Sequence, residues 1–175
     1  MDEQQLWDVI GEARRRGGDD AEAVAARAAD LLAARPRAEI LGAQQVFWDL
    51  MAASYRGELW AAAHLINGGC SDDGFEYFRG WLITRGREVF ERAVAEPDSL
   101  AELAAVRAAA EAYEDLECED ALAVAWTAHR AATGEDLPDD CFTIGYPAVR
   151  IGWDFEDEAE TARRLPRLSA LFARD

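Results

Sequence analysis

The chain has 175 residues; half of them are apolar and 30% are charged, which is enough apolar surface for a core and excludes a largely disordered chain. The 35 acidic residues outnumber the 18 basic ones, giving a formal net charge of −17. A field of that sign repels phosphate backbones and anionic lipid head groups, so we expect no direct binding to nucleic acid and none to a membrane.

The N-terminal half of the chain carries a repeated 3.6-residue apolar period that is interrupted by glycine, proline and capping residues. A first helix carries the stripe from Leu6 to Ala13 and ends at Gly17 and Gly18. A second begins at Asp19 or Asp20 and ends before Pro36. The next predicted helices span residues 37–55, 58–67 and 73–85. The helix predicted over residues 73–85, the fifth, is apolar on two sides, so we expect it to lie at the centre of the fold.

The C-terminal half continues with a helix over residues 87–96 that Pro97 ends, and Asp98 or Ser99 is expected to cap the next one. Residues 104–133 are predicted to be helical. Residues 137–153 lose the helical period and predict extended chain or a small hairpin. A last helix is expected over residues 156–174, kinked or split at Pro166. The sequence therefore predicts an all-α, single-domain multi-helix bundle over residues 1–175, with a short irregular or extended excursion near 137–153.

The turn between the helices predicted over residues 58–67 and 73–85 contains a pair of glycines and a helix-capping pattern. Gly68 and Gly69 follow an uninterrupted helical pattern, so at least one of them is expected to be left-handed. Asp73 and Glu76 have the spacing of a capping box, which predicts Asp73 as the cap of the fifth helix.

The most distinctive stretch is Leu59–Arg79, which reads LWAAAHLINGGCSDDGFEYFR. It resembles the bacterial domain of unknown function 4240 family, whose members carry a closely similar Leu-Ile-Asn-Gly-Gly-Cys-Ser-Asp-Asp-Gly-Phe block. The stretches Pro97–Leu100, Thr133–Glu135 and Leu165–Leu168 are also similar. The resemblance implies a family without an assigned biochemical activity, so it provides no mechanism.

Polar side chains gather at this turn. On the fourth predicted helix, one face carries Trp60, His64 and Asn67. Leu59, Ala63 and Ile66 of the same helix point to the core. The candidate ligand-binding residues are Trp60, His64, Asn67, Cys70, Ser71, Asp72, Asp73 and Arg79. They could line a pocket for a small polar ligand, or His64, Asp72 and Asp73 could hold a divalent metal. In the structural alternative, Arg79 forms a salt bridge, Asp73 caps a helix and His64 is half-buried, so the Gly68–Gly74 loop is only scaffold.

Known cofactor sites fit this sequence poorly. Phe75 and Glu76 stand where a phosphate-binding loop needs Lys and Ser or Thr. Gly69 and Gly80 stand where a calcium loop needs acidic ligands. The cysteines Cys70, Cys118 and Cys141 are too scattered for a zinc site and are expected to be free thiols. We therefore predict no cofactor and no metal.

The leading functional hypothesis is a non-enzymatic interaction or small-ligand-binding module with an unknown protein or small-molecule partner. The alternative is a small enzyme using the polar pocket around His64, Cys70, Asp72, Asp73 and Arg79, with Cys70 or Ser71 as nucleophile. The acidic N-terminus lacks the pattern of a signal peptide, and we expect a cytoplasmic protein. His129 is expected at the surface or its boundary. The acidic run Glu111–Asp120 predicts a solvated face or a patch that binds arginine.

Overall fold

The computed structural model describes residues 1–173 and is all-α. Of these residues, 72% lie in α or 3₁₀ helices, and none lies in a strand. The elements are α1 (Glu3–Gly17), α2 (Ala21–Ala33), α3 (Arg37–Ala53), α4 (Gly57–Ile66), α5 (Asp72–Thr84), α6 (Arg87–Ala95), η1 (Pro97–Glu102), α7 (Ala104–Ala112), η2 (Glu119–Ala123), α8 (Val124–Thr133), η3 (Asp139–Cys141), α9 (Glu158–Arg164) and α10 (Pro166–Phe172). The predicted fold class is confirmed.

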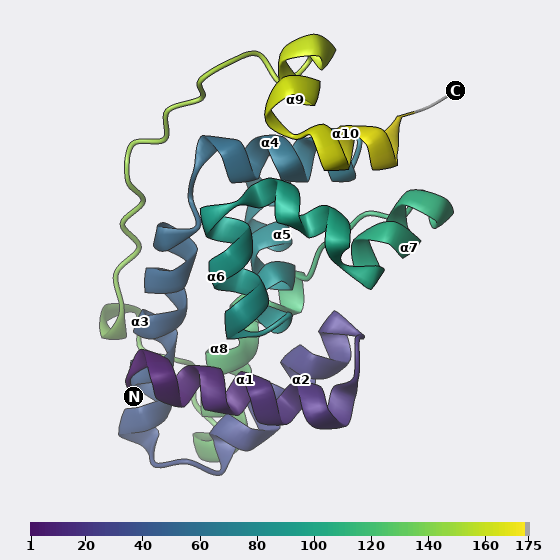
Figure 1. Cartoon of the computed structure of the whole chain (residues 1–175). Helices are drawn as coiled ribbons and strands as arrows, with labels where there is room; N and C mark the ends of the chain where they lie inside the picture. Colours follow the sequence, from purple (N-terminus) through teal and green to yellow (C-terminus); the bar gives the residue numbers. More distant parts are fainter. Residues whose placement is uncertain (174–175) are drawn as a thin grey trace.

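The helices are arranged around α5, which runs through the middle of the molecule (Figure 1). Helix α1 packs on α2, and both α2 and α3 pack on α8 at one end. Helices α4, α9 and α10 form the opposite end. Phe75, Phe78 and Leu82 of α5 are fully buried, and Trp81 of the same helix is almost fully buried. The prediction that this helix is central is confirmed.

Helix boundaries in the first half follow the local signals. Asp2 and Gln5 form a capping box at the start of α1, and Gly18 ends that helix with a φ of 69°. The carboxylate of Asp20 accepts hydrogen bonds from the amides of Glu22 and Ala23 and so caps α2. Of the two caps that the sequence offered for α2, the structure uses Asp20.

The turn between α4 and α5 differs from the prediction in one respect. Gly68 and Gly69 adopt φ values of 64° and 134°, which confirms the expected left-handed backbone. The cap of α5, however, is Ser71, whose Oγ accepts a hydrogen bond from the amide of Gly74 at 3.1 Å. The prediction of Asp73 as the cap is wrong, because the helix begins at Asp72 and places Asp73 inside its first turn.

Because Ser71 and not Asp73 caps α5, we expect alanine substitutions at these two positions to change stability by different amounts. Ser71→Ala should lower the free energy of unfolding by about 1 kcal/mol, because the Gly74 amide loses its acceptor. Asp73→Ala should cost less than about 0.5 kcal/mol, because the exposed carboxylate contributes only through the helix dipole. Urea unfolding of the two variants measures both values, and a larger loss for Asp73→Ala would restore Asp73 as the cap.

Residues 104–133 do not form the expected continuous helix. Helix α7 ends where Tyr113 takes a φ of 58°, and residues 114–118 are not helical before η2 and α8 resume. The amide of Cys118 donates a hydrogen bond to the carbonyl of Tyr77 on α5 at 3.0 Å. A β-carbon at Gly80 would lie 2.6 Å from the Cys118 carbonyl oxygen. Close packing against Gly80 therefore breaks a pattern that is helical by its local sequence.

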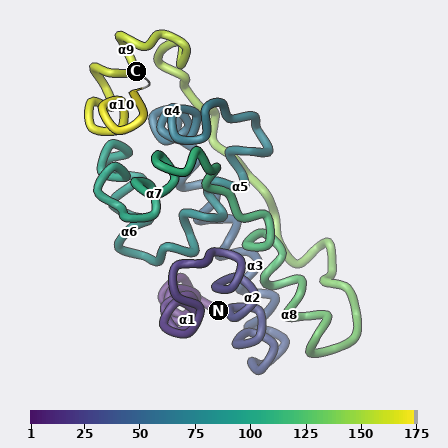
Figure 2. The backbone as a smooth tube through the Cα atoms, turned by 90° about the vertical axis from the view of Figure 1, so that its right-hand side faces the viewer, coloured from purple at the N-terminus to yellow at the C-terminus, as the bar shows by residue number. Residues whose placement is uncertain are grey.

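Residues 142–155, here called the strap, are extended and form neither a hairpin nor a strand. Figure 2 shows the chain running from the end of α8 along α3 to α9. The side chain of Gln45 accepts from the amide of Thr143 at 2.8 Å and donates to its carbonyl at 3.2 Å. Phe142 stacks on Trp48, and a β-carbon at Gly57 would collide with the carbonyl oxygen of Arg150. Side chains of the helical body thus hold the strap in place.

Two further expectations in the last third of the chain are corrected. The final helical region begins at Glu158 and not at residue 156, whereas its predicted split at Pro166 is confirmed, because Pro166 has no amide hydrogen and starts α10. Residue 174, the predicted end of that region, lies outside the described residues. His129 is fully buried, not at the surface: its Nε2 accepts from Arg37 Nε at 3.1 Å, and its Nδ1 lies 3.0 Å from the Glu135 carbonyl. A neutral imidazole with its proton on Nδ1 satisfies both contacts.

Within residues 1–173, the helices are all too short or too polar to cross a lipid bilayer.

Candidate functional site

Trp60 and Asn67 shape the loop that follows α4. The indole Nε1 of Trp60 donates to the carbonyl of Cys70 at 3.0 Å, and its ring stacks on Phe75 with centroids 4.9 Å apart. The Oδ1 of Asn67 accepts from the amide of Leu116 at 3.0 Å, which joins the loop to the segment after α7. The Nδ2 of Asn67 is buried and has no partner among the described residues. Both side chains therefore serve the loop's own structure.

Cys70 and Ser71 show no sign of an activated nucleophile. Burial and the nearby carboxylate of Glu117 raise the pKa of the Cys70 thiol to about 12, so the thiol is protonated at neutral pH. The hydroxyl of Ser71 accepts the capping hydrogen bond. Asp72 and Asp73 are exposed. The three cysteines are free thiols, as the sequence predicted.

Arg79 is the largest fully buried side chain in the described structure. Its Nε and Nη1 donate to the carbonyls of Phe75 and Met51 at 3.1 and 2.6 Å. The guanidinium carbon lies between 4.6 and 5.0 Å from the ring centres of Tyr55, Phe75 and Tyr146. The predicted salt bridge of Arg79 is therefore wrong, because carbonyls and aromatic faces surround this cation where a carboxylate was expected.

The phenol of Tyr146 connects Arg79 to a carboxylate indirectly. It lies 3.4 Å from Arg79 Nη2 and donates to Glu76 Oε1 at 2.7 Å. Burial and this hydrogen bond raise the pKa of Tyr146 to about 12, so the phenol stays protonated and remains the donor. Tyr146 belongs to the strap, and the contact fixes the strap to α5.

His64 faces a different part of the molecule. Its Nε2 lies 3.1 Å from Glu156 Oε1, and its ring centre lies 5.6 Å from that of Phe155. These residues line an open groove of about 780 Å³ between the end of α4 and the pair α9 and α10. The groove has two carboxylates, Glu156 and Glu158, and apolar walls that include Leu65, Phe155 and Phe172. Of the eight candidate residues, His64 is the one that lines this groove.

A second, smaller depression of about 100 Å³ adjoins the groove and is called the hollow below. Asn67, Tyr113, Glu114 and Asp115 line it. The groove and the hollow share four lining residues, Leu65, Gly68, Phe172 and Ala173. The two depressions therefore lie on either side of one ridge.

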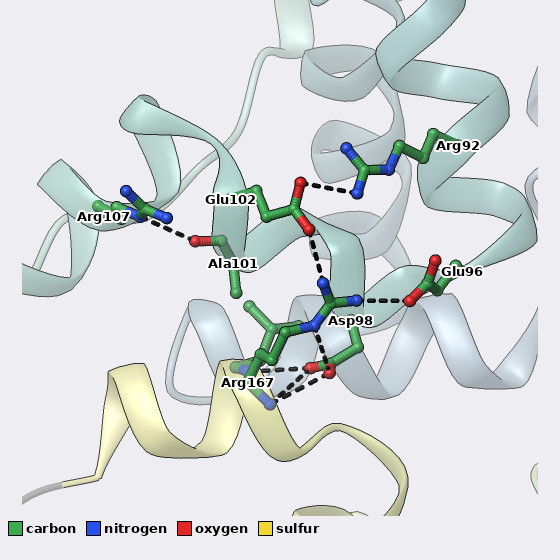
Figure 3. Close-up of polar contacts among 8 residues, drawn as sticks. Arg92, Glu96, Asp98, Ala101, Glu102, Arg107 and Arg167 are labelled. Carbon is green, nitrogen blue, oxygen red and sulfur yellow. Dashed lines mark hydrogen bonds and ion pairs between the residues drawn. The ribbon is translucent and has the colours of Figure 1, made fainter.

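Helix α10, which forms one wall of the groove, is held by charged residues of η1 (Figure 3). The carboxylate of Asp98 accepts from the amides of Arg167 and Leu168 at 2.9 to 3.1 Å and from Arg167 Nε at 3.1 Å. Arg167 also pairs with Glu96 and Glu102. Asp98 is thus a helix cap, as the sequence suggested, but it caps α10 instead of the helix that follows it.

The candidate residues therefore do not form one site: Arg79 is buried in the body of the protein, His64 lines the groove, Asp72 and Asp73 are exposed, and the other four belong to the loop and its supports. The sequence missed Phe155, Glu156 and Glu158, because Glu156 is 92 residues from His64 and no spacing pattern links them. In residues 1–173, no three His, Cys, Asp or Glu side chains come close enough to hold a metal ion, so His64, Asp72 and Asp73 do not form the metal site left open by the sequence. The ligand-binding role of the eight residues stays a prediction.

Comparison with known proteins gives one match. The model of the family described as "Protein of unknown function (DUF4240)" matches residues 1–131. No curated protein and no solved structure matches the chain. The matched range contains the Leu59–Arg79 block and Pro97–Leu100, whereas the strap, α9, α10 and the two later similar stretches lie outside it. Because the match covers 131 of the 175 residues, the chain belongs to the DUF4240 family.

Proposed function

We propose that this protein is a non-enzymatic binding module whose ligand site is the groove between α4, α9 and α10. The groove itself is the observation that supports this proposal. Its volume of about 780 Å³ lies within the range of about 300 to 1,000 Å³ that is common for small-molecule sites. Apolar walls and a few polar groups, among them the His64–Glu156 pair, are also typical of such sites.

The contacts around His64 do not favour the enzyme alternative. A nucleophile needs a base within hydrogen-bond reach, yet His64 is paired with Glu156. The Cys70 thiol is protonated at neutral pH, and the Ser71 hydroxyl caps α5. A binding module requires none of these groups to react.

The negative net charge of the chain argues against polyanions as partners of this module. A net charge of −17 repels polyanions, so the proposal includes neither nucleic acid nor an anionic membrane surface among its partners. Either a small molecule or a protein remains a suitable partner for the groove.

A fragment titration followed by two-dimensional ¹H–¹⁵N NMR tests the proposal. A set of neutral, anionic and cationic fragments at millimolar concentration should include members that shift the amide signals of His64, Thr161 and Ser169, because these residues line the groove. The expected shifts should saturate with fragment concentration.

Two tryptophan substitutions provide the control for the titration. Ala162→Trp places a large ring in the groove and should abolish the shifts, whereas Ala132→Trp, on an exposed face of α8, should leave them unchanged. The proposal fails if the fragments shift no groove residue, or if Ala162→Trp binds the same fragments as the unsubstituted protein.

A further inference from the structure

The groove and the hollow each carry two acidic residues. Glu156 and Glu158 line the groove, and Glu114 and Asp115 line the hollow. In the part of the chain that the structure describes, no Arg or His lies within ion-pair distance of Glu158, Glu114 or Asp115. By contrast, Glu160 on α9 pairs with both Arg163 and Arg164. The two depressions therefore keep negative charge that arginine neutralises elsewhere on the surface.

The ridge between the two depressions is apolar. Leu65 and Phe172 line both of them, and both side chains are half-buried. Among residues 1–173, no arginine contributes to either lining. An extended ligand crossing this ridge would contact carboxylates at each end and apolar side chains in between.

Carboxylates at two ends with apolar side chains between them match one class of ligand. A carboxylate attracts an ammonium group, and an aliphatic chain between two ammonium groups can lie on apolar surface in the way that a lysine side chain does. A neutral ligand would leave the carboxylates unused, and a ligand with a single positive charge would use one end only. The net charge of −17 also raises the local concentration of cations at the surface.

We propose that the groove and the hollow together bind a linear aliphatic polyamine, with one ammonium group at Glu156 and Glu158 and another at Glu114 and Asp115. This inference rests on the proposed function of the groove and adds the class of ligand. The methylene chain between the two ammonium groups crosses Leu65 and Phe172.

Isothermal titration calorimetry at low ionic strength, with the diamine 1,8-diaminooctane as the probe, tests this inference. 1,8-Diaminooctane should bind at least about tenfold more tightly than n-octylamine, because the second ammonium group binds as part of the same molecule. The neutral chain 1,8-octanediol, which has the same length, should bind more weakly than 1,8-diaminooctane, because it lacks the charges.

Matched double variants separate the site from the general field of the protein. Glu156→Gln with Glu158→Gln, and separately Glu114→Gln with Asp115→Asn, should each raise the Kd for 1,8-diaminooctane about fivefold. Glu22→Gln with Asp30→Asn removes the same charge from α2, at the far end of the molecule (Figure 1), and should change the Kd less than about twofold.

The possible outcomes keep the two proposals apart. If neutral fragments bind in the groove but 1,8-diaminooctane binds no more tightly than 1,8-octanediol, the polyamine inference is wrong and the binding function stands. If the α2 control weakens the binding of 1,8-diaminooctane as much as the groove variants do, the attraction is unspecific and the inference is also wrong. If neither the fragments nor 1,8-diaminooctane bind, the proposed function itself fails.

Discussion

Replacing Arg79 with methionine is expected to lower the free energy of unfolding by about 3 kcal/mol. The guanidinium is fully buried, and it donates to two carbonyls and lies against three aromatic rings. Methionine keeps most of the aliphatic volume but loses every one of these polar and cation–π contacts. A desolvated cation–π contact is worth up to about 2 kcal/mol, and a hydrogen bond from a charged donor about 1.5 to 3 kcal/mol.

The cost of burying the charge of Arg79 acts in the opposite direction and favours the methionine variant. Burying a charge is costly, and replacing a buried ion with an apolar side chain of similar volume is stabilising in some proteins. Here we expect the contacts to outweigh that cost, because three ring faces and two carbonyls replace most of the solvation that Arg79 loses. Equal or greater stability of Arg79→Met in guanidinium chloride unfolding would show that the cost of burial dominates.

Two additional variants locate the effect. Arg56→Met removes an exposed guanidinium and should change stability by less than about 0.5 kcal/mol. Tyr146→Phe keeps the ring but removes the hydroxyl that joins Arg79 to Glu76, and it should cost about 1 kcal/mol. A larger loss for Tyr146→Phe than for Arg79→Met would place the main interaction between the strap and Glu76.

Replacing Asp98 with alanine should lower the free energy of unfolding by about 3 kcal/mol. The carboxylate is nearly buried and accepts from two backbone amides at the start of α10 and from the Arg167 side chain. Alanine removes all of these acceptors and leaves the amide of the buried Leu168 without a partner. This loss combines that of a helix cap with that of a charge-assisted hydrogen bond.

The effect of Asp98→Ala should also be local. Amide hydrogen exchange in α10 should accelerate more than exchange in α1, because Asp98 connects α10 to η1. Glu102→Gln is the control: it weakens an exposed pair with Arg167 and should have a much smaller effect than Asp98→Ala (Figure 3). Equal effects of the two substitutions would show that the ion pairs of Arg167, and not the cap, hold α10.

The sequence by itself determined the helices and most of their ends, because these depend on interactions within one or two turns. The carboxylate of Asp20 bonds to amides two and three residues away, and Gly68 takes the left-handed backbone that a residue without a β-carbon adopts easily. Pro166 splits the last helical region because its own ring prevents an amide hydrogen bond. The cap of α5 was predicted wrongly as Asp73, because the hydroxyl of Ser71 can also accept from a helix amide and the spacing of Asp73 and Glu76 does not exclude it.

Tertiary structure decided the features that join distant parts of the chain. Residues 114–118 leave the helical pattern because the Cys118 carbonyl packs against Gly80 of α5. Asp98 caps a helix that begins 68 residues later in the chain, at Pro166. The groove forms because the fold brings Glu156 to His64 across 92 residues of sequence. Local preferences contain no information about such pairs, since only the packing of the helices around α5 sets which side chains meet.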